Sequence, residues 1–561
     1  MKYFVATSLV AFFMTAVLSC SAQLLSPKTS AYNHQDTLRG SVGTGRSWWN
    51  VKKYDLSVAV DIAGKTIQGN NRVTFEVRQP GKNKIMQVDL QEPMTIEKIE
   101  YLNEKGRSLP FKREGNAYWV DFGATSFPAN GQQVITIYFK GKPRAAVNPP
   151  WDGGWIWKSD EKGRSWVSVA CQGLGASVWY PCKDYQGDEP DNGASLSVTV
   201  PDPLVAVGNG RLKNKTANTN GTTTWQWEVT APINSYNIIP YIGYYANWTE
   251  KYTGEKGDLD CSYWVLDYNL EKAQKQFGRD VKPMLKCFEY WFGPYPFYED
   301  SYKLVEAPHL GMEHQSAVAY GNKYKNGYLG MDLSGSGWGT KWDYIIIHES
   351  GHEWFGNNIT TDDIADMWVH EGFTDYSEPL FVECQYGKQA GDEYLQGLRR
   401  NIQNDTPVIG PYGVNKEGSG DMYAKGANLL HIIRQVIQND SLFRMILRGL
   451  NSDFYHKTVT SAIVEKYISE KAGKDFSKLF DQYLRTTKIP VLEYELKGKK
   501  ISYRWSNTIA GFDMPVLVSI NQKEQWIRPT GEWQALHLAD GQDSNTFTIN
   551  PNFYIISKKE D

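Results

Sequence analysis

Alternation of hydrophobic and polar positions dominates the first part of the chain. Runs with this pattern occur at residues 54–62, 72–77, 133–139 and 194–200, and turn residues separate them. Successive side chains of a strand point to opposite faces, so the alternation predicts strands with one buried face. We therefore expect an N-terminal antiparallel β domain over residues 46–253.

The hydrophobic spacing changes to the period of a helix in the middle of the chain. Residues 269–293 have this spacing, and helix signals dominate from there to about residue 484. Alternation returns from Ile489 onward. The pattern predicts an α+β multidomain fold, with a mostly helical domain over residues 254–487 and a small β domain over residues 488–561.

Residues 1–22 have the layout of a bacterial export signal, with Lys2, an apolar stretch and then small residues. Two processing routes fit. The residues before Cys20 resemble a lipobox, which would leave Cys20 lipid-modified, whereas cleavage after Ala22 would release a soluble protein beginning at Gln23. Both routes predict an exported protein, either periplasmic or lipid-anchored in the bacterial cell envelope.

Length and charge add three expectations. A chain of 561 residues exceeds what one compact core accommodates, which agrees with several domains. Residues 23–45 are polar and turn-rich, so we expect a flexible lead-in there, and no later segment is apolar enough to span a membrane. The formal net charge of −3, without a basic stripe, argues against a nucleic-acid partner.

The cysteines show no disulfide framework and no CxxC pair. Apart from Cys20, they are Cys171, Cys182, Cys261, Cys287 and Cys384. We expect free buried thiols, with a Cys171–Cys182 bridge as the alternative.

A candidate metal site follows a buried apolar run in IIIHESGHEWFGN, residues 345–357. His348 and His352 are four positions apart, so on a helix their imidazoles share one face and can bind one cation, and Glu349 projects beside it. This is the spacing of zinc proteases, in which a glutamate acts on water. Glu371, with eighteen residues between it and His352, supplies the third ligand that a catalytic zinc needs.

Two more carboxylates follow Glu371 on the same predicted helix. Asp375 and Glu378 lie about one and two turns beyond it. Either they accept hydrogen bonds from the ligand histidines and orient them, or they are solvated helix charges. The sequence leaves both interpretations open.

These motifs resemble those of the gluzincin metallopeptidases of the aminopeptidase N family, which includes the leukotriene hydrolases. HESGHEWFGN, WVHEGF, MYAKG at 422–426 and MEH at 312–314 stand in the family's order, and the likeness covers roughly residues 46–561. The resemblance implies a thermolysin-like catalytic domain, a C-terminal β-sandwich and one zinc ion per chain. It also implies roles for five residues, with zinc ligands His348, His352 and Glu371, general base Glu349 and oxyanion donor Tyr423.

The resemblance further implies a pocket for the free amine of a peptide. Glu313 of the LGMEH segment and Gln172 of the N-terminal domain match the residues that grip the amine. Gly311 and Met312 are implied to contact the substrate as well.

Four positions depart from the family's usual pattern, namely Leu310, His314, His370 and Glu353. None of them removes a metal ligand or the base, so we expect them to affect substrate preference more than hydrolysis. Residues 151–160 are rich in tryptophan and glycine, and they either line the pocket for the first side chain or form a packed interdomain turn.

The leading interpretation is an exported zinc-dependent aminopeptidase that removes N-terminal residues from peptides. A thermolysin-type zinc endopeptidase is an alternative, because it shares the three ligands but needs no amine pocket. A lipid epoxide hydrolase and a non-catalytic peptide-binding protein on the same scaffold are further alternatives. The sequence does not determine the oligomeric state.

Overall fold

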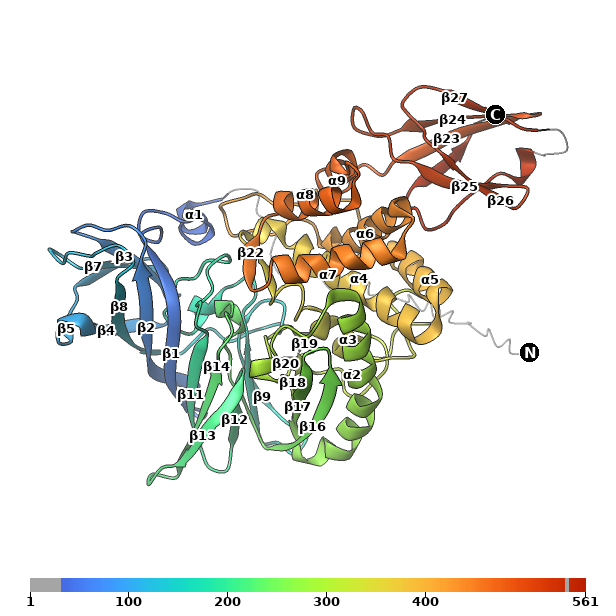
Figure 1. Ribbon diagram of the computed structural model, residues 1–561. Coiled ribbons are helices and arrows are strands. Elements are labelled where there is room, and N and C mark those ends of the chain that lie inside the picture. The colour runs from blue at the N-terminus through green and yellow to red at the C-terminus, as the bar shows by residue number, and fades with distance from the viewer. Residues whose placement is uncertain (1–31, 540–543, 561) are drawn as a thin grey trace, which may run out of the picture.

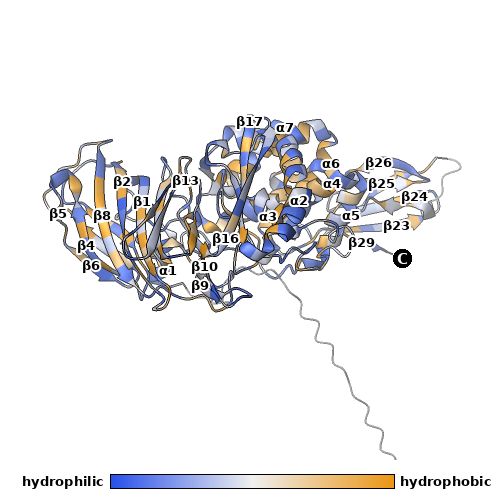
Figure 2. Cartoon of the chain, turned by 90° about the horizontal axis from the view of Figure 1, so that it is seen from below, coloured by the Kyte–Doolittle hydropathy of each residue, from blue (hydrophilic) through white to orange (hydrophobic). Residues whose placement is uncertain are grey.

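Three parts of the chain lie in a row in the computed structural model, which describes residues 32–539 and 544–560. A β-rich part stands at one end, a mostly helical part in the middle and a smaller β part at the other end (Figure 1). The perpendicular view in Figure 2 shows the same order along the long axis. The α+β multidomain fold predicted from the sequence is confirmed. The expected export signal, including Cys20, lies outside the described residues.

The N-terminal part is built on one large sheet. Its strand order is β13-β14-β11-β1-β2-β8-β4-β5, and β1 pairs with β11 in parallel while the other neighbours are antiparallel. Buried and half-buried residues alternate along most of β1 (Trp49–Asp61), as the sequence pattern predicts. Two smaller sheets, β12-β15-β10-β9 and β3-β7-β6, share one hydrophobic core with it. The remaining strands of these three sheets are β2 (Thr66–Val77), β3 (Ile85–Asp89), β4 (Thr95–Tyr101), β5 (Arg107–Ser108), β6 (Phe111–Glu114), β7 (Ala117–Asp121), β8 (Gln132–Gly141), β9 (Gly154–Ser159), β10 (Ser165–Ala170), β11 (Ala194–Pro201), β12 (Val205–Val207), β13 (Arg211–Ala217), β14 (Thr222–Val229) and β15 (Tyr241–Gly243).

The middle part combines a five-stranded sheet, β16-β17-β18-β20-β19, with helices α2 to α9. β16 pairs with β17 along its whole length, so the boundary expected at residues 253 and 254 falls inside one hairpin. The pairing moves the start of this part to about residue 245, a shift that the sequence hides because alternation continues across the junction. Among the described residues, no helix has the length and apolar character needed to cross a bilayer. The strands here are β16 (Tyr245–Gly254), β17 (Gly257–Leu266), β18 (Tyr302–Glu306), β19 (Gly311–Met312), β20 (Val318–Tyr320), β21 (Ile359–Thr361) and β22 (Lys457–Val459). The helices are α2 (Leu270–Phe292), α3 (Tyr344–Gly351), α4 (Trp368–Tyr386), α5 (Lys388–Leu398), α6 (Ala424–Ile437), α7 (Asp440–Asp453), α8 (Ser461–Ala472) and α9 (Ser477–Leu484).

The C-terminal part consists of two small sheets, β27-β24-β23-β29 and β26-β25-β28. Its buried side chains continue the hydrophobic core of the middle part, and the Tyr483 hydroxyl of α9 donates to the Tyr554 carbonyl at 2.6 Å. The strands are β23 (Val491–Lys497), β24 (Lys500–Ser506), β25 (Val516–Ile520), β26 (Lys523–Ile527), β27 (Gln534–His537), β28 (Thr548–Ile549) and β29 (Ile556–Lys559).

The expected flexible lead-in is wrong for residues His34–Gly40, which form helix α1. The Asn33 side chain accepts hydrogen bonds from two backbone N–H groups of its first turn. Distant residues hold the helix in place, with His34 beside Glu114 at 2.9 Å. A helix of seven residues has too little hydrophobic periodicity to be predicted from the sequence.

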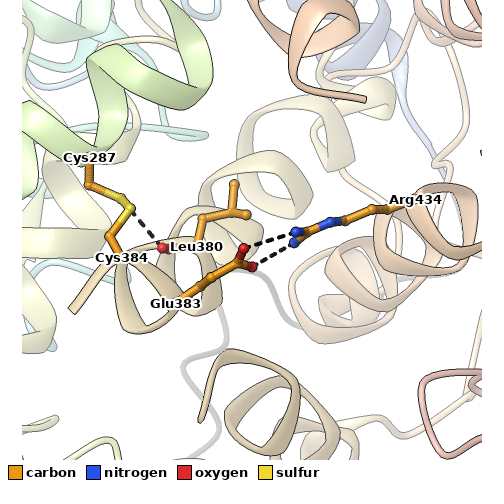
Figure 3. Close-up of a disulfide and its surroundings, with 5 residues drawn as sticks. All are labelled: Cys287, Leu380, Glu383, Cys384 and Arg434. Atoms are coloured by element: carbon orange, nitrogen blue, oxygen red, sulfur yellow. Dashed lines mark hydrogen bonds and ion pairs between the residues drawn. A yellow bond between two sulfur atoms is a disulfide. The ribbon is translucent and has the colours of Figure 1, made fainter. Parts of the chain in front are cut away.

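A disulfide joins Cys287 of α2 to Cys384 of α4 (Figure 3). The expectation of free thiols is therefore wrong for this pair, whereas Cys171, Cys182 and Cys261 are free and buried. The alternative bridge between Cys171 and Cys182 is not formed. The bonded cysteines are 97 positions apart, and only the packing of two helices brings them together, which no local motif announces.

Candidate active site

Helix α3 carries the first two candidate residues, His348 and Glu349, into the centre of the molecule. Its N-terminus is capped by Asp343, whose Oδ1 accepts from the N–H of Ile345 at 3.2 Å. The three isoleucines that follow the first helical residue are at most 1% exposed, so the apolar run anchors the helix and brings the polar residues behind it into the interior. His352 lies just beyond the end of α3.

His348, His352 and Glu371 meet at one point. Glu371 stands on the first turn of α4, and its Oε2 lies 3.8 Å from His348 Nε2 and 3.3 Å from His352 Nε2. All three residues are buried, and their ligand atoms lie within 4.8 Å of one another. Glu371 Oε2 has no hydrogen-bond partner of normal geometry among the described residues. A buried oxygen in this state fits a position beside a cation.

The other ring nitrogen of each histidine is already engaged. His348 Nδ1 lies 2.7 Å from Glu378 Oε1, and His352 Nδ1 lies 3.0 Å from the Phe355 carbonyl oxygen. These contacts orient the rings so that both Nε2 atoms face the shared space. Two imidazole nitrogens and one carboxylate are a donor set that zinc prefers, so the residues fit a zinc ion.

The charges around this point favour a cation. Burial alone would raise the pKa of Glu371, but His352 and His348 hold that pKa well below its ordinary value. Burial would lower the pKa of His348, but Glu371 and Glu378 raise it well above the ordinary value. The cluster therefore attracts positive charge into a place from which water is largely excluded.

The two carboxylates beyond Glu371 have different surroundings. Glu378 contacts a ligand histidine and also accepts from the Tyr394 hydroxyl at 2.6 Å. Asp375 is 5% exposed, and among the described residues it makes no hydrogen bond to either histidine. Because both side chains are buried, the interpretation that they are solvated helix charges is wrong.

Glu349 lies against the backbone of β19. A Cβ added at Gly311 would lie 2.4 Å from Glu349 Oε1, so only a glycine lets the strand approach this closely. Burial raises the pKa of Glu349 to about 7, against the opposing effect of His348 and His352. A carboxylate with this pKa exchanges its proton near neutral pH.

Glu313 forms the acidic end of the site. The Gln172 amide donates to Glu313 Oε1, and the Tyr236 hydroxyl donates to the same oxygen at 2.8 Å. Asn357 Nδ2 donates to the Glu313 carbonyl oxygen at 2.8 Å. Burial raises the pKa of Glu313 above its ordinary value, so this carboxylate gains from a cation at its side.

Sequence reasoning missed Tyr236 and Asn357. Tyr236 lies in a single 3-10 turn, 77 positions before Glu313, and no spacing relates the two. Asn357 belongs to the HESGHEWFGN segment, but its contact with the Glu313 backbone depends on how that segment turns after α3.

Tyr423 lies immediately before α6, with its ring centroid 6.0 Å from that of His348. Burial first, and then the carboxylates of Glu371 and Glu313, raise the pKa of Tyr423 well above the ordinary value. The phenol therefore keeps its proton and remains a hydrogen-bond donor. Gly372 and Gly426 let α4 and α6 approach closely, because a Cβ on Gly372 would lie 3.1 Å from the Gly426 Cα.

One cavity of about 60 Å³ is lined by all the residues singled out from the sequence as catalytic, metal-binding or substrate-binding. They are His348, Glu349, His352, Glu371, Tyr423, Gln172, Gly311, Met312 and Glu313. The structure thus gathers residues from the N-terminal β part, β19, α3, α4 and the segment before α6 around one space.

Among the four departures from the family pattern, Leu310 lines this cavity. His314, His370 and Glu353 are 0% exposed and make hydrogen bonds within the core. Trp151 also lines the cavity, so the tryptophan-rich segment contributes to the wall. A neighbouring cavity of about 390 Å³ is also lined by Trp151 and Leu310, so these two residues lie between the two cavities.

Two family models match the chain. The model described as "Peptidase family M1 domain" matches residues 278–483, and "Peptidase M1 N-terminal domain" matches residues 50–237. Together the two matches cover more than half of the chain and include every residue that lines the cavity. Pro150, Trp151 and Gln172 fall in the N-terminal match, and the other lining residues fall in the match to residues 278–483.

The chain is also similar to named proteins. It is 23% identical to aminopeptidase N of Lactococcus lactis over 79% of this chain and 52% of that protein. It is 23% identical to endoplasmic reticulum aminopeptidase 1 of Rattus norvegicus over 76% of this chain and 48% of that protein. The chain thus spans about half the length of these relatives. The leukotriene A-4 hydrolase of Xenopus laevis matches 75% of the chain at 23% identity.

The fold is similar to that of solved structures. An M1 zinc metallopeptidase mutant from Deinococcus radiodurans, bound to a Tyr-Ser-Ala substrate, superposes with a TM-score of 0.67 and 19% identity. The superposition covers 80% of this chain and 96% of that chain. At this identity the likeness concerns the fold alone.

Proposed function

This chain belongs to peptidase family M1, and from that premise we propose that it is a zinc-dependent aminopeptidase that removes residues from the free amino end of peptides. The observation that carries the proposal is the single cavity in which a metal-binding triad and the buried Glu313 carboxylate face the same space. A metal triad suits peptide hydrolysis in general. The acidic end suits a substrate whose amine is charged and free.

His348, His352 and Glu371 would hold one zinc ion per chain. Zinc, when bound, supplies Lewis acidity that polarises a carbonyl group and lowers the pKa of water. Glu378 and the Phe355 carbonyl keep the two imidazole rings in the orientation that this binding needs.

Glu349 and Tyr423 would carry the proton transfer and the charge stabilisation. Glu349 accepts a proton from the water that attacks the peptide carbonyl and returns it to the departing amine. The Tyr423 hydroxyl, which keeps its proton, donates a hydrogen bond to the carbonyl oxygen as that oxygen gains negative charge. Burial of the cavity strengthens both contacts, because the effective dielectric constant is low there.

Glu313 would bind the substrate's ammonium group. Gln172 and Tyr236 both donate to Oε1 of its carboxylate, which fixes the group in place. A blocked amine would leave this buried charge without a partner, at a cost of roughly 1–3 kcal/mol or more. The same grip would place the first peptide bond beside Glu349 and the residues that would hold the metal, so cleavage would fall after the first residue.

The alternatives make different demands on this pocket. A thermolysin-type endopeptidase gains nothing from a buried carboxylate at the end of the cleft. A non-catalytic binding protein does not need Glu349 and Tyr423 beside the metal triad. An epoxide hydrolase has no specific observation in its favour.

We also propose that the protein is exported, either released after Ala22 or lipid-anchored through Cys20. The Cys287–Cys384 disulfide supports an oxidising compartment outside the cytosol. Mass spectrometry of the protein purified from its own cell envelope distinguishes a lipid-modified Cys20 from a chain that begins at Gln23. A chain that retains Met1 in the cytosol would contradict export.

The test of the catalytic proposal uses two substitutions and an aminoacyl arylamide substrate. Glu349→Gln is expected to abolish turnover while the zinc content stays near one per chain. Glu313→Gln is expected to raise KM by about tenfold or more, because the amine loses its charged partner. Near-normal turnover by Glu349→Gln would refute the assigned base, and an unchanged KM for Glu313→Gln would refute the amine pocket.

A further inference from the structure

Gln172 stands on a short loop that contacts of distant residues tie to the rest of the chain. Residues 171–175 connect β10 to a short 3-10 turn (Ala176–Val178), and two glycines, Gly173 at φ 70° and Gly175 at φ 94°, adopt backbone conformations that other residues rarely reach. Within the loop, the Gly175 N–H donates to the Cys171 carbonyl at 2.6 Å and the Leu174 N–H donates to the Gln172 carbonyl at 2.7 Å. These two bonds shape the loop but do not tie it to the rest of the chain, which Gln91 Nε2 does by donating to the Leu174 carbonyl at 2.7 Å and two further side chains do at the Gly173 carbonyl.

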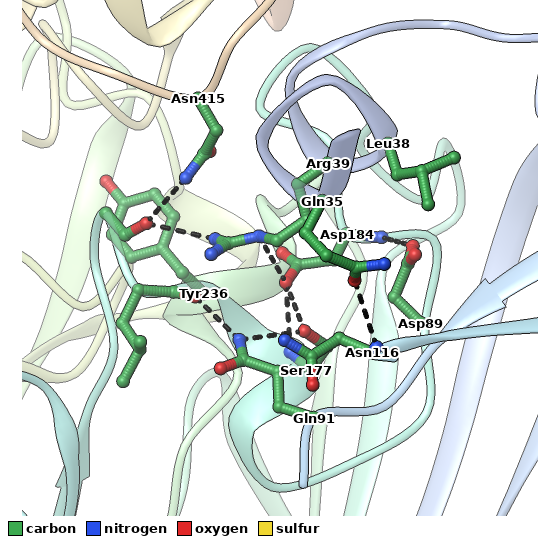
Figure 4. A network of polar contacts seen from close by, with 12 residues as sticks. Gln35, Leu38, Arg39, Asp89, Gln91, Asn116, Ser177, Asp184, Tyr236 and Asn415 are labelled. Atoms are coloured by element: carbon green, nitrogen blue, oxygen red, sulfur yellow. Dashed lines mark hydrogen bonds and ion pairs between the residues drawn. The ribbon is translucent and has the colours of Figure 1, made fainter. Parts of the chain in front are cut away.

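Two side chains from distant segments donate to one backbone oxygen of this loop. Arg39 Nη2 donates to the Gly173 carbonyl at 3.0 Å, and Asn415 Nδ2 donates to the same oxygen at 3.1 Å (Figure 4). Arg39 belongs to α1, 134 positions away, and Asn415 belongs to the middle part, 242 positions away. Gly173 directly follows Gln172, so both donors act one residue from the side chain that contacts Glu313.

Both donors are themselves held. The Arg39 Nε lies 3.6 Å from Asp184 Oδ2, which also accepts from Ser177 Oγ, in the 3-10 turn that follows the loop, at 2.5 Å. A Cβ on Gly40 would lie 2.1 Å from the Asn415 backbone nitrogen, so the end of α1 packs directly on the backbone around Asn415. Figure 4 draws Arg39, Asp184, Ser177 and Asn415 within one network of polar contacts.

We propose that Arg39 and Asn415 are positioning residues that hold the Gln172 loop against Glu313, so that α1 completes the amine pocket. The inference rests on the proposed function, because it concerns the same pocket. Neither residue lines the cavity. They act through the Gly173 carbonyl, which fixes one side of the loop while the Gln172 amide bonds Glu313 on the other side.

The consequence is selective. Without the two donors the loop gains conformational freedom, and Gln172 spends less time in the orientation in which its amide donates to Glu313. Binding of a charged amine then weakens, because the free-energy cost of ordering the loop is subtracted from the free energy of binding. The metal triad, Glu349 and Tyr423 lie on α3, just beyond its end, on α4 and before α6. Segments other than the loop therefore carry them.

The experiment measures peptide binding in the Glu349→Gln background, which holds peptide without cleaving it. Calorimetry gives Kd for a tripeptide with a free amine and for its N-acetylated twin. Arg39→Ala and Asn415→Ala together are expected to weaken binding of the free-amine peptide by about tenfold and to leave the acetylated peptide unchanged. Asn415→Asp, which keeps the shape but removes the donor, is expected to reproduce part of the loss, and it remains useful if the double variant does not fold. Arg39→Lys, which keeps a donor, is expected to restore part of the affinity.

Arg211→Ala is the matched control. Arg211 also joins the N-terminal part to backbone carbonyls of the middle part, those of Tyr298 and Glu299, but it does not line the cavity. Equal affinity of parent and variants for the free-amine peptide overturns this inference and leaves the proposed function intact. An equal loss in Arg211→Ala overturns it as well, because the effect would be general loosening of the interface. A parent that binds neither peptide refutes the proposed function and the inference with it.

Discussion

The close approach of β19 to the general base gives the sharpest prediction, the effect of Gly311→Ala. The new methyl group would lie 2.4 Å from Glu349 Oε1, whereas an ordinary contact needs 3.4–4 Å. Either the Glu349 carboxylate or the strand must therefore move by about 1 Å. A displacement of this size at a catalytic group costs on the order of 10²-fold in rate. We expect kcat to fall about a hundredfold.

The assay combines steady-state hydrolysis of an aminoacyl arylamide with metal analysis and thermal melting. The zinc content is expected to stay near one per chain, because the three atoms nearest to the new methyl group all belong to Glu349 and none to the triad. If β19 moves instead of Glu349, overpacking also lowers the free energy of unfolding by about 1–3 kcal/mol, which the melting curve reports. Gly278→Ala is the matched control, since a Cβ there meets nothing within 4 Å and helix α2 gains up to about 1 kcal/mol from alanine. A Gly311→Ala enzyme with kcat within twofold of the parent would refute the reasoning.

Three further predictions follow from the structure. Burial raises the pKa of Glu189 to about 7 from an ordinary 4.5, so the ionised side chain destabilises the folded state above pH 7, and this destabilisation disappears as the pH falls to 4.5. Glu189→Gln should therefore raise the free energy of unfolding by up to about 3 kcal/mol at pH 8 and by little at pH 4.5. An equal gain at both pH values would contradict the raised pKa. Replacing Cys287 and Cys384 by serine should lower that free energy by roughly 2–5 kcal/mol in denaturant titrations, while an unchanged midpoint would show that the bridge does not form in the purified protein. Tyr423→Phe should lower kcat by about 10²–10³-fold with KM nearly unchanged, and a rise in KM alone would assign the phenol to substrate binding instead.

The sequence predicts those parts of the site that depend on local spacing. His348 and His352 share a helix turn, and Glu371 begins the helix that returns to them, so a 3.6-residue period and one short connection suffice. The alternation along β1 likewise predicts a sheet with one buried face, which the structure confirms.

Contacts between distant segments escape such reasoning. Tyr236 reaches Glu313 because a 3-10 turn of the N-terminal part lies beside the residue that follows β19, and no periodicity connects the two positions. The bond between Cys287 and Cys384 depends on the packing of α2 against α4. Helix α1 is too short to show a pattern, and its place beside Asn415 is fixed by tertiary contacts alone.

The central claim is that the buried Glu313 end of the cavity selects a free amine. The most direct measurement incubates the purified, zinc-quantified protein with one peptide and with its N-acetylated twin, and follows the products by mass. We expect removal of single residues from the amino end of the free peptide and no cleavage of the acetylated one. Equal internal cleavage of both peptides would contradict the claim and favour an endopeptidase, and no cleavage of either would favour a binding protein.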